Sequence, residues 1–450
     1  MNKSELIYRR ITYSLFIILF LIVTPLIIFY TQGYRFNFKN QHIQQTGILV
    51  ISSNPKKADI TLNDKYTEKN TPTRLENLMP GNYNIKLSKP GYYSWEKKLP
   101  IYENYTSFAE NILLWKQTTS SPLTNIASSG QIAISPNKQD AYFIDNKGSL
   151  NFLDTASASY QAIASLGIGT IIESYDWNIG GYKTLLKTKN NKNQIDYYLL
   201  TNGRYFFSNI NLTKITSLIP PQTTIARINN AGTIIFALAG SNLWQIDLIK
   251  KQNSIILKDK KISDYLINND TIYAINEKQL IAINKNKTIR QLSQLDFNDG
   301  KFLTSLNSDR LVIANLEKAN GAIIDLSGND SPIAINITGA SWLNKDVILF
   351  NNDFEVWLYD INKNNPEIIT RLGKQIKTTA WHPLGRHIII ATDDNIKIIE
   401  IDNRELRNVV NLAIDNTSEI NNLITDTNGQ NLYFTGSINK QNKLIYLNIR

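Results

Sequence analysis

The sequence predicts an all-β protein that follows a single N-terminal transmembrane helix. Three observations lead to this prediction. Residues 11–30 are uncharged and predominantly apolar, residues 47–118 alternate short strand-like stretches with Pro-Gly pairs, and the remainder contains a weak repeat of about 40 residues. We therefore expect a cytoplasmic tail at 1–10, a membrane helix at 11–30, a linker at 31–46, a small β-sandwich at 47–118 and a β-propeller at 119–450.

The composition is that of a folded protein with more than one domain. A chain of 450 residues exceeds one ordinary core, and 42% hydrophobic with 19% charged residues suffices for globular folding. The absence of cysteine excludes disulfides, thiolate metal sites and thiol nucleophiles. The net charge of +10 is concentrated before residue 119, where it would attract a membrane surface or an anionic envelope polymer. Because no basic stripe or nucleic-acid motif accompanies it, we expect no nucleic-acid partner.

The apolar segment Ile11–Tyr30 reads ITYSLFIILFLIVTPLIIFY. A helix of this length covers roughly 30 Å, which matches the hydrocarbon thickness of a bilayer. Pro25 is compatible with a membrane helix. A cleaved signal peptide would have a shorter apolar region that ends in small residues, whereas this segment ends in bulky side chains. The segment therefore predicts an uncleaved signal anchor.

The charges beside this segment predict its orientation. Lys3, Arg9 and Arg10 precede it, whereas Arg35 and Lys39 follow it. The excess of basic residues favours a cytoplasmic N-terminus. We therefore expect a single-pass protein of the cell membrane, with both folded domains outside the cytoplasm.

The region that begins at Gly47 has the alternation of a small β-sandwich. One strand is expected at Ile48–Ile51, and after a turn a second strand alternates apolar and polar residues. Pro80-Gly81 and Pro90-Gly91 then bound a strand in which Tyr83, Ile85 and Leu87 alternate with polar residues. These Pro-Gly pairs predict turns rather than a ligand site.

The residues 52–101, SSNPKKADITLND followed by TPTRLENLMPGNYNIKLSKPGYYSWEKKLPI, resemble a PEGA domain, a small β-sandwich module of prokaryotic surface proteins. The Thr71-Pro72 pair, Pro80–Tyr83 and Lys89–Tyr92 match elements of that family. The first turn departs from the pattern, because Lys57 stands where the family has glycine. The resemblance implies a structural or adhesive envelope module with no chemistry of its own.

Three aromatic residues near the end of this module are candidate binding residues. Tyr92, Tyr93 and Trp95 would form an aromatic platform for a sugar ring if their side chains were exposed together. The alternative is that they pack in the core and at the rim of the sandwich.

The repeat from residue 119 consists of an apolar strand, a polar turn and further strands, one of which often ends in Asp. Its copies predict the four-stranded blades of a propeller, because their spacing of 36 to 52 residues brackets the usual blade length. We favour eight blades, with seven as the alternative if the weak copy at Tyr175 is an insertion. The first turns of the copies lie at Pro136, Asn178, Asn230, Asn269, Ser308, Asn344, Pro383 and Asn428.

The ends of the repeat region predict ring closure. The final copy stops after three strands, so residues 121–127 are expected to supply the outer strand of the last blade. The turn ISPNKQDAYFI and the related WHPLGRHIII resemble the repeat of WD-like and Tol-type propellers, although only parts of the usual Ser-Pro-Asp-Gly turn are retained. Propellers have many functions, so this resemblance implies a fold rather than an activity.

No catalytic or metal-binding motif stands out in the sequence. His382 and His387 flank one turn, and the fragments that begin at Asp325 and Asp426 lack the full spacing of a calcium loop. Trp177, Trp342 and Trp381 recur at the end of first strands, where packing between blades is favoured over ligand stacking. We expect no metal and no cofactor. A set of aspartates recurs where a strand-ending turn is expected: Asp154, Asp247, Asp325, Asp360 and Asp402.

These observations predict a non-enzymatic, membrane-anchored envelope protein whose propeller binds a protein or glycan partner. The alternative is an extracytoplasmic hydrolase that acts through carboxylates in the propeller channel, since such sites assemble from separate blades. Clustered, buried carboxylates at a channel mouth would favour that alternative.

Overall fold

The structure is a computed structural model, and it describes residues 3–38, 41–126, 131–202, 210–268, 271–304, 309–327, 331–414 and 417–450. The chain divides into two compact units. The first contains residues 1–117 together with 402–410, and the second contains residues 118–401 and 411–450.

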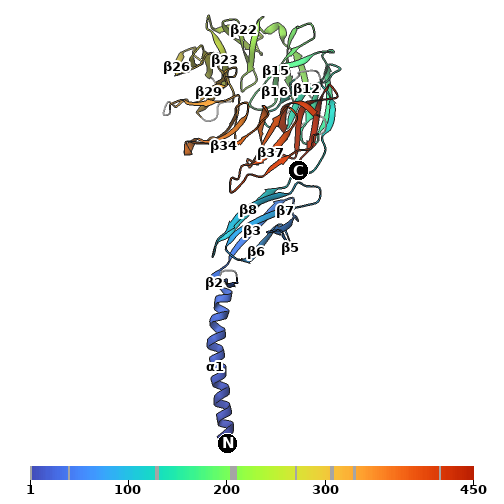
Figure 1. Cartoon of the computed structure of the whole chain (residues 1–450). Coiled ribbons are helices and arrows are strands. Elements are labelled where there is room, and N and C mark those ends of the chain that lie inside the picture. The colour runs from blue at the N-terminus through green and yellow to red at the C-terminus, as the bar shows by residue number, and fades with distance from the viewer. Residues whose placement is uncertain are drawn as a thin grey trace. The chain divides into compact units, whose positions relative to one another are not determined.

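The first unit begins with the helix α1, Lys3–Thr31, drawn in blue in Figure 1. The helix contains the predicted apolar segment and continues back through most of the predicted tail. Within the described residues, Ile7–Thr31 is the one helix that is long and apolar enough to cross a membrane, and none of its most apolar window is buried. Most of the apolar side chains described in this helix are therefore exposed.

The segment predicted as a linker forms a two-stranded antiparallel hairpin. Strand β1, Tyr34–Asn37, pairs with β2, His42–Gln45. Gly33, whose positive φ of 84° suits glycine, precedes the hairpin, and its carbonyl oxygen accepts a hydrogen bond from the Thr46 amide. This segment was expected to be a linker, and no strand was predicted in it.

The next strands form the predicted sandwich of two sheets around an apolar core. One sheet has the order β6-β3-β9 and the other β5-β4-β7-β8, with β3 and β9 parallel. The core includes Leu49, Ile60, Ile85 and Leu99, which are the inward positions of alternating strands. The strands are β3 Gly47–Asn54, β4 Asp59–Leu62, β5 Lys65–Asn70, β6 Thr73–Leu78, β7 Gly81–Ser88, β8 Trp95–Ile101 and β9 Thr106–Leu113.

The turns of the sandwich have the predicted structural role. Gly81 begins β7, and Gly91 lies in the turn before β8 with φ of 80°, a conformation that favours glycine. Lys57 has φ of 63° in the first turn. A lysine therefore adopts the left-handed conformation at the position where the PEGA pattern has glycine.

A segment from late in the sequence completes the first unit. Lys97 on β8 is only 1% exposed, and its Nζ lies 3.3 Å from Asp402 Oδ2 and donates to the Asp402 carbonyl oxygen at 2.8 Å. Burial alone would raise the pKa of Asp402, but hydrogen bonds from Arg404 and the charge of Lys97 lower that pKa to about 2. The charge of the buried lysine is thus paired.

Within the described ranges, residues 121–448 form eight four-stranded sheets in the manner of a β-propeller. The weak copy at Tyr175 forms one complete sheet, β15–β18. The first four sheets comprise β11 Ala133–Ile134, β12 Asp140–Ile144, β13 Ser149–Asp154, β14 Ser159–Ser165; β15 Ile171–Trp177, β16 Lys183–Lys189, β17 Ile195–Thr201, β18 Asn211–Lys214; β19 Thr223–Ile228, β20 Ile234–Ala239, β21 Asn242–Asp247, β22 Gln252–Leu257; and β23 Ile262–Asn268, β24 Thr271–Asn276, β25 Gln279–Ile283, β26 Ile289–Gln294.

The remaining sheets continue the same antiparallel order, and two short 3-10 helices, Thr216–Leu218 and Ile361–Lys363, lie in connections. These sheets comprise β27 Lys301–Phe302, β28 Arg310–Asn315, β29 Asn320–Asp325, β30 Ile333–Asn336; β31 Gly339–Trp342, β32 Val347–Asn351, β33 Glu355–Asp360, β34 Asn365–Arg371; β35 Ile376–Trp381, β36 His387–Thr392, β37 Ile396–Glu400, β38 Val409–Asn411; and β39 Thr417–Thr425, β40 Asn431–Ile438, β41 Gln441–Asn448 with β10 Ser121–Asn125.

The ring closes as predicted. Strand β10 pairs with β41, so the start of the second unit supplies the outer strand of its last sheet. Ala127, the end of the predicted strand, lies outside the described residues. Apolar clusters fill the spaces between successive sheets; one joins Phe143 on β12 to Tyr433 on β40. Closure therefore buries the faces of the first and last sheets against each other.

Candidate functional site

The predicted aromatic platform is not formed in the sandwich. Trp95 is only 3% exposed and belongs to the apolar core, so it was wrongly assigned to a binding surface. It lies at an inward position of β8, where alternation directs the ring between the two sheets. Tyr92 is partly buried against the same core, and Tyr93 is half-buried. The role of Tyr92 and Tyr93 as binding residues stays a prediction, without the ring of Trp95 beside them.

The recurring aspartates close turns. The Oδ1 atoms of Asp154, Asp247 and Asp402 accept hydrogen bonds from backbone amides two residues later. The same bond is made by Asp325 and Asp360. Their recurrence is thus explained by turn formation, as the sequence predicted.

The recurring tryptophans pack between sheets. Trp177 stacks on Tyr142 of the preceding sheet, with ring centroids 5.4 Å apart. Trp342 Nε1 donates to Thr304 Oγ1, and Trp381 Nε1 donates to the Ser341 carbonyl oxygen. The packing interpretation is confirmed for all three.

The histidines and the calcium-like fragments have structural partners. His382 is buried and its Nε2 lies 3.0 Å from the Gly429 carbonyl oxygen, while burial lowers its pKa to about 4. Asp426 Oδ1 accepts hydrogen bonds from the Gln430 and Asn431 amides and so closes a turn. Across the described ranges, no group of three or more histidine or acidic residues is placed to hold a metal ion.

One cavity of the propeller lies where the first strands of neighbouring sheets end. Its volume is about 430 Å³. Apolar residues such as Leu266 and Phe302 line it together with polar ones such as Asn230. Mixed lining of this kind is typical of ligand sites, in which a few polar groups orient a largely apolar contact.

A charged network connects four first strands at this cavity. Arg227 on β19 directs Nη2 to Asp264 Oδ1 on β23 at 3.1 Å, while Asp264 Oδ2 accepts from the Phe302 amide of the next sheet at 3.0 Å. Asp176 on β15 accepts from the Ile228 amide at 2.7 Å through Oδ2. Each carboxylate therefore joins its own first strand to the following one.

The network has unequal acidities. Burial raises the pKa of Asp176 to about 6, although the charge of Arg227 and the Ile228 amide oppose this. Burial by itself lowers the pKa of Arg227, but the charges of Asp264 and Asp176 raise it overall. Arg227 is consequently held as a cation between two carboxyl groups, and the pKa of one of them, that of Asp176, is raised.

Two donors at this cavity have no partner. Within the part of the chain that the structure describes, Trp177 Nε1 and Arg227 Nε are buried and make no hydrogen bond. Both residues line the cavity. Such N–H groups without acceptors are costly, and both are covered by protein atoms rather than exposed on the cavity surface.

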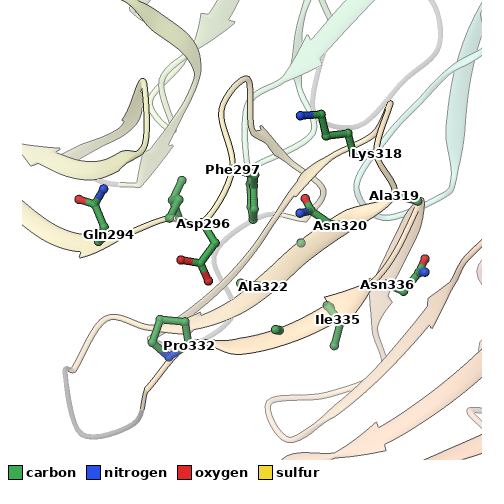
Figure 2. A pocket seen from close by; sticks show the side chains of 13 residues that line it. Gln294, Asp296, Phe297, Lys318, Ala319, Asn320, Ala322, Pro332, Ile335 and Asn336 are labelled. Carbon is green, nitrogen blue, oxygen red and sulfur yellow. The ribbon is translucent and has the colours of Figure 1, made fainter.

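A second hollow lies at the outer part of two neighbouring sheets and has a volume of about 550 Å³. Figure 2 shows Asp296 and Phe297, which follow β26, near Asn320 and Ala322 of β29. Most of its polar side chains, including Asp296, Lys318 and Asn336, are exposed to solvent. Because its polar groups are exposed to water, they need no ligand to satisfy them. This hollow is therefore a weaker candidate for a binding site than the cavity between the first strands.

The sequence singled out Trp177, with packing favoured over ligand stacking, but not the charged residues beside it. Asp176 and Arg227 both lie two residues before a turn asparagine, Asn178 or Asn229, whose Oδ1 accepts amides four and five residues later. Aligning the copies on these turns would have placed the two charges at one equivalent position. Asp264 does not share that position, and only the structure brings it to Arg227.

Comparisons with known proteins agree with both folded parts. Residues 46–112 match the family model of the PEGA domain, which confirms the resemblance seen in residues 52–101. No curated protein matches the chain.

Two solved structures are similar to the chain as β-propellers. The C-terminal WD40 domain of Sif2 is 13% identical with a TM-score of 0.53, over 73% of this chain and 98% of that one. Dihydro-heme d1 dehydrogenase NirN in complex with DHE is 10% identical with a TM-score of 0.51, over 74% of this chain and 76% of that one. At these identities the likeness shows the fold alone.

Proposed function

We propose that this protein is a membrane-anchored binding protein whose propeller holds a segment of a partner protein in the cavity between the first strands. Helix α1 serves as an uncleaved anchor with its N-terminus in the cytoplasm, and the PEGA domain and the propeller lie outside the cell membrane. The observation that carries the binding role is the partly apolar cavity whose lining includes Trp177 and Arg227, each of which has a buried N–H without an acceptor.

The lining of the cavity favours a peptide over other ligands. Leu266, Phe302 and Leu303 offer apolar contact, whereas the two donors require acceptors such as backbone carbonyl groups. A neutral acceptor fits better than an anion, because Asp176 and Asp264 already balance the charge of Arg227. A peptide supplies both apolar side chains and neutral acceptors.

The hydrolase alternative has less support. The carboxyl group of Asp176 does line the cavity, and its pKa is raised, as that of an acid catalyst would be. However, Asp176 and Asp264 each accept a backbone amide of the next strand, and the cation of Arg227 interacts with both. These contacts give both carboxyl groups a structural role.

A pair of matched variants tests the binding site. Ile179 lines the cavity and is 72% exposed, whereas Ile249, in the turn after β21, is 76% exposed and is absent from the cavity lining. Full-length wild-type protein, Ile179→Glu and Ile249→Glu would be purified in lipid nanodiscs. Each would be mixed with envelope extract of the same cells, and bound proteins identified by mass spectrometry.

We expect a protein that is retained by the wild type and Ile249→Glu but reduced at least tenfold with Ile179→Glu. The affinity of that purified protein for the three nanodisc samples would then be measured by calorimetry. Equal retention by all three would refute a protein site in this cavity. Retention of a polysaccharide instead would favour the glycan alternative.

A protease experiment tests the orientation of the anchor. Protease added to intact cells is expected to degrade the PEGA domain and the propeller while a cytoplasmic marker protein survives. Full protection of both domains in cells that are degraded after lysis would contradict the proposed topology.

A further inference from the structure

We propose that the hairpin β1–β2 lies in the interfacial layer of the bilayer, with Phe36, Phe38 and Ile43 in contact with lipid. This inference rests on the proposed anchoring by α1. It adds a second membrane contact to the first unit, beside the helix itself.

The hairpin has one apolar face. Phe36 and Ile43 are directly opposite each other in the strand register, so their side chains share a face. Phe38, two residues beyond Phe36, packs edge-on against its ring with centroids 5.1 Å apart. The three side chains are 47%, 62% and 87% exposed for Phe36, Ile43 and Phe38 respectively. A contiguous exposed apolar surface on so small an element indicates an interaction site.

The other face of the hairpin is held by the sandwich. Arg35 and Gln44 oppose each other in the register. Arg35 Nη2 donates to Asn77 Oδ1 at 2.8 Å, and Gln44 Nε2 lies 3.5 Å from Met79 Sδ. Because these contacts use the polar face, the apolar face is directed away from them.

The hairpin is tied closely to the end of the helix. Tyr34, on the apolar face, packs edge-on against Phe29 of α1 with ring centroids 5.3 Å apart. The Arg35 guanidinium lies over the Tyr30 ring at 3.7 Å and donates to the Tyr30 carbonyl oxygen at 2.8 Å. The aromatic surface of the helix end therefore continues onto the hairpin.

The short connection between α1 and β1 keeps the hairpin close to lipid. Helix α1 ends at Thr31 and β1 begins at Tyr34, so at most roughly 10 Å of chain separates them. The headgroup layer on each side of the hydrocarbon is about 5 to 8 Å thick. If α1 spans the membrane, the hairpin thus starts within or directly beside this layer.

The chemistry of the face suits that layer. Aromatic side chains concentrate at membrane interfaces, and amphipathic elements bury an apolar face at the boundary between headgroups and acyl chains. Arg35 has its charge on the opposite side, where it bonds to protein and backbone groups. Lipid is accordingly the occupant for this face, because the helix brings it there without any further partner.

The absence of cysteine in the sequence permits a direct test. Four full-length variants, Phe20→Cys, Phe38→Cys, Ile43→Cys and Ile249→Cys, would each carry one nitroxide label in phosphatidylcholine–phosphatidylglycerol vesicles. Power saturation would compare collisions with oxygen, which concentrates in lipid, and with a water-soluble nickel complex. Phe20 lies within α1, and Ile249 is an exposed aliphatic residue of the propeller, matched to Ile43.

We expect labels at positions 20, 38 and 43 to collide more with oxygen than with nickel, with position 20 deepest, and the label at position 249 to show the reverse. A lipid-exposed label at 20 with water-exposed labels at 38 and 43 would overturn this inference and leave the anchor intact. A water-exposed label at position 20 would overturn the anchor itself.

Discussion

Arg227 Nη2 lies 3.1 Å from Asp264 Oδ1, and this ion pair joins first strands of two neighbouring sheets of the propeller. The Asp264 side chain is 5% exposed and that of Arg227 26%. Asp264 extends the connection by accepting the Phe302 amide of the next sheet. A single guanidinium thus stabilises the junction of strands on which the cavity depends.

Arg227→Gln is expected to destabilise the propeller by about 3 to 5 kcal/mol, because it leaves a buried carboxylate without its partner. Urea unfolding followed by tryptophan fluorescence would measure this. The matched control is Arg371→Gln, since Arg371 pairs with Glu355 but is 71% exposed. The control should change stability far less, because exposed ion pairs contribute little. Equal losses in both variants would contradict a special role for the buried pair.

Asp176→Asn tests the raised pKa of Asp176 through the pH dependence of stability. The folded pKa is about 6 against an ordinary value of 3.8, so its stabilising contribution is complete below pH 3.8 and is lost as pH rises through 6. The stability of Asp176→Asn relative to the wild type should therefore increase between pH 4 and pH 7 and then level off. Chemical unfolding at a series of pH values would measure it.

The control for this prediction is Asn298→Ser at an exposed position, because it changes no ionisable group. Its stability difference from the wild type should stay constant over the same pH range. A constant difference for Asp176→Asn as well would show that Asp176 is charged to the same extent in the folded and unfolded protein.

Gly429→Ala is expected to destabilise the junction between the last two sheets by about 1 to 3 kcal/mol or more. Gly429 has φ of 65°, and a Cβ at this position would overlap the His382 ring. Gly373→Ala is the control, because no atom lies within 4 Å of its Cβ position and its φ is not in the left-handed region. Thermal unfolding by calorimetry would compare them, and an unchanged melting temperature for Gly429→Ala would refute the close contact.

Trp95→Ala is expected to destabilise the PEGA domain by about 3 to 5 kcal/mol, because it removes a large side chain from the core. Tyr66→Ala, at a 58% exposed position, should have little effect. Limited proteolysis of the full-length variants would report the stability of this domain. If Trp95→Ala were stable but bound glycan less tightly, the result would instead support the aromatic platform that the sequence predicted.

The sequence by itself determined the apolar helix, the alternating strands of the sandwich and the turns of the repeats. These features depend on residues close in sequence: the uncharged segment around Pro25, the alternation from Tyr83 to Leu87, and the turn aspartates such as Asp247, which bonds to the Ile249 amide. Ring closure was also predictable, because the last copy lacked one strand.

Tertiary structure alone decided the burial of Trp95, the ion pair of Arg227 with Asp264 and the apolar face of the hairpin. Arg227 and Asp264 are 37 residues apart, and their pairing requires two sheets to bring their first strands together. Phe36 and Ile43 share a face only because of the strand register. The physical reason is that local patterns specify how each strand alternates, whereas the neighbours of a side chain depend on how strands and sheets assemble.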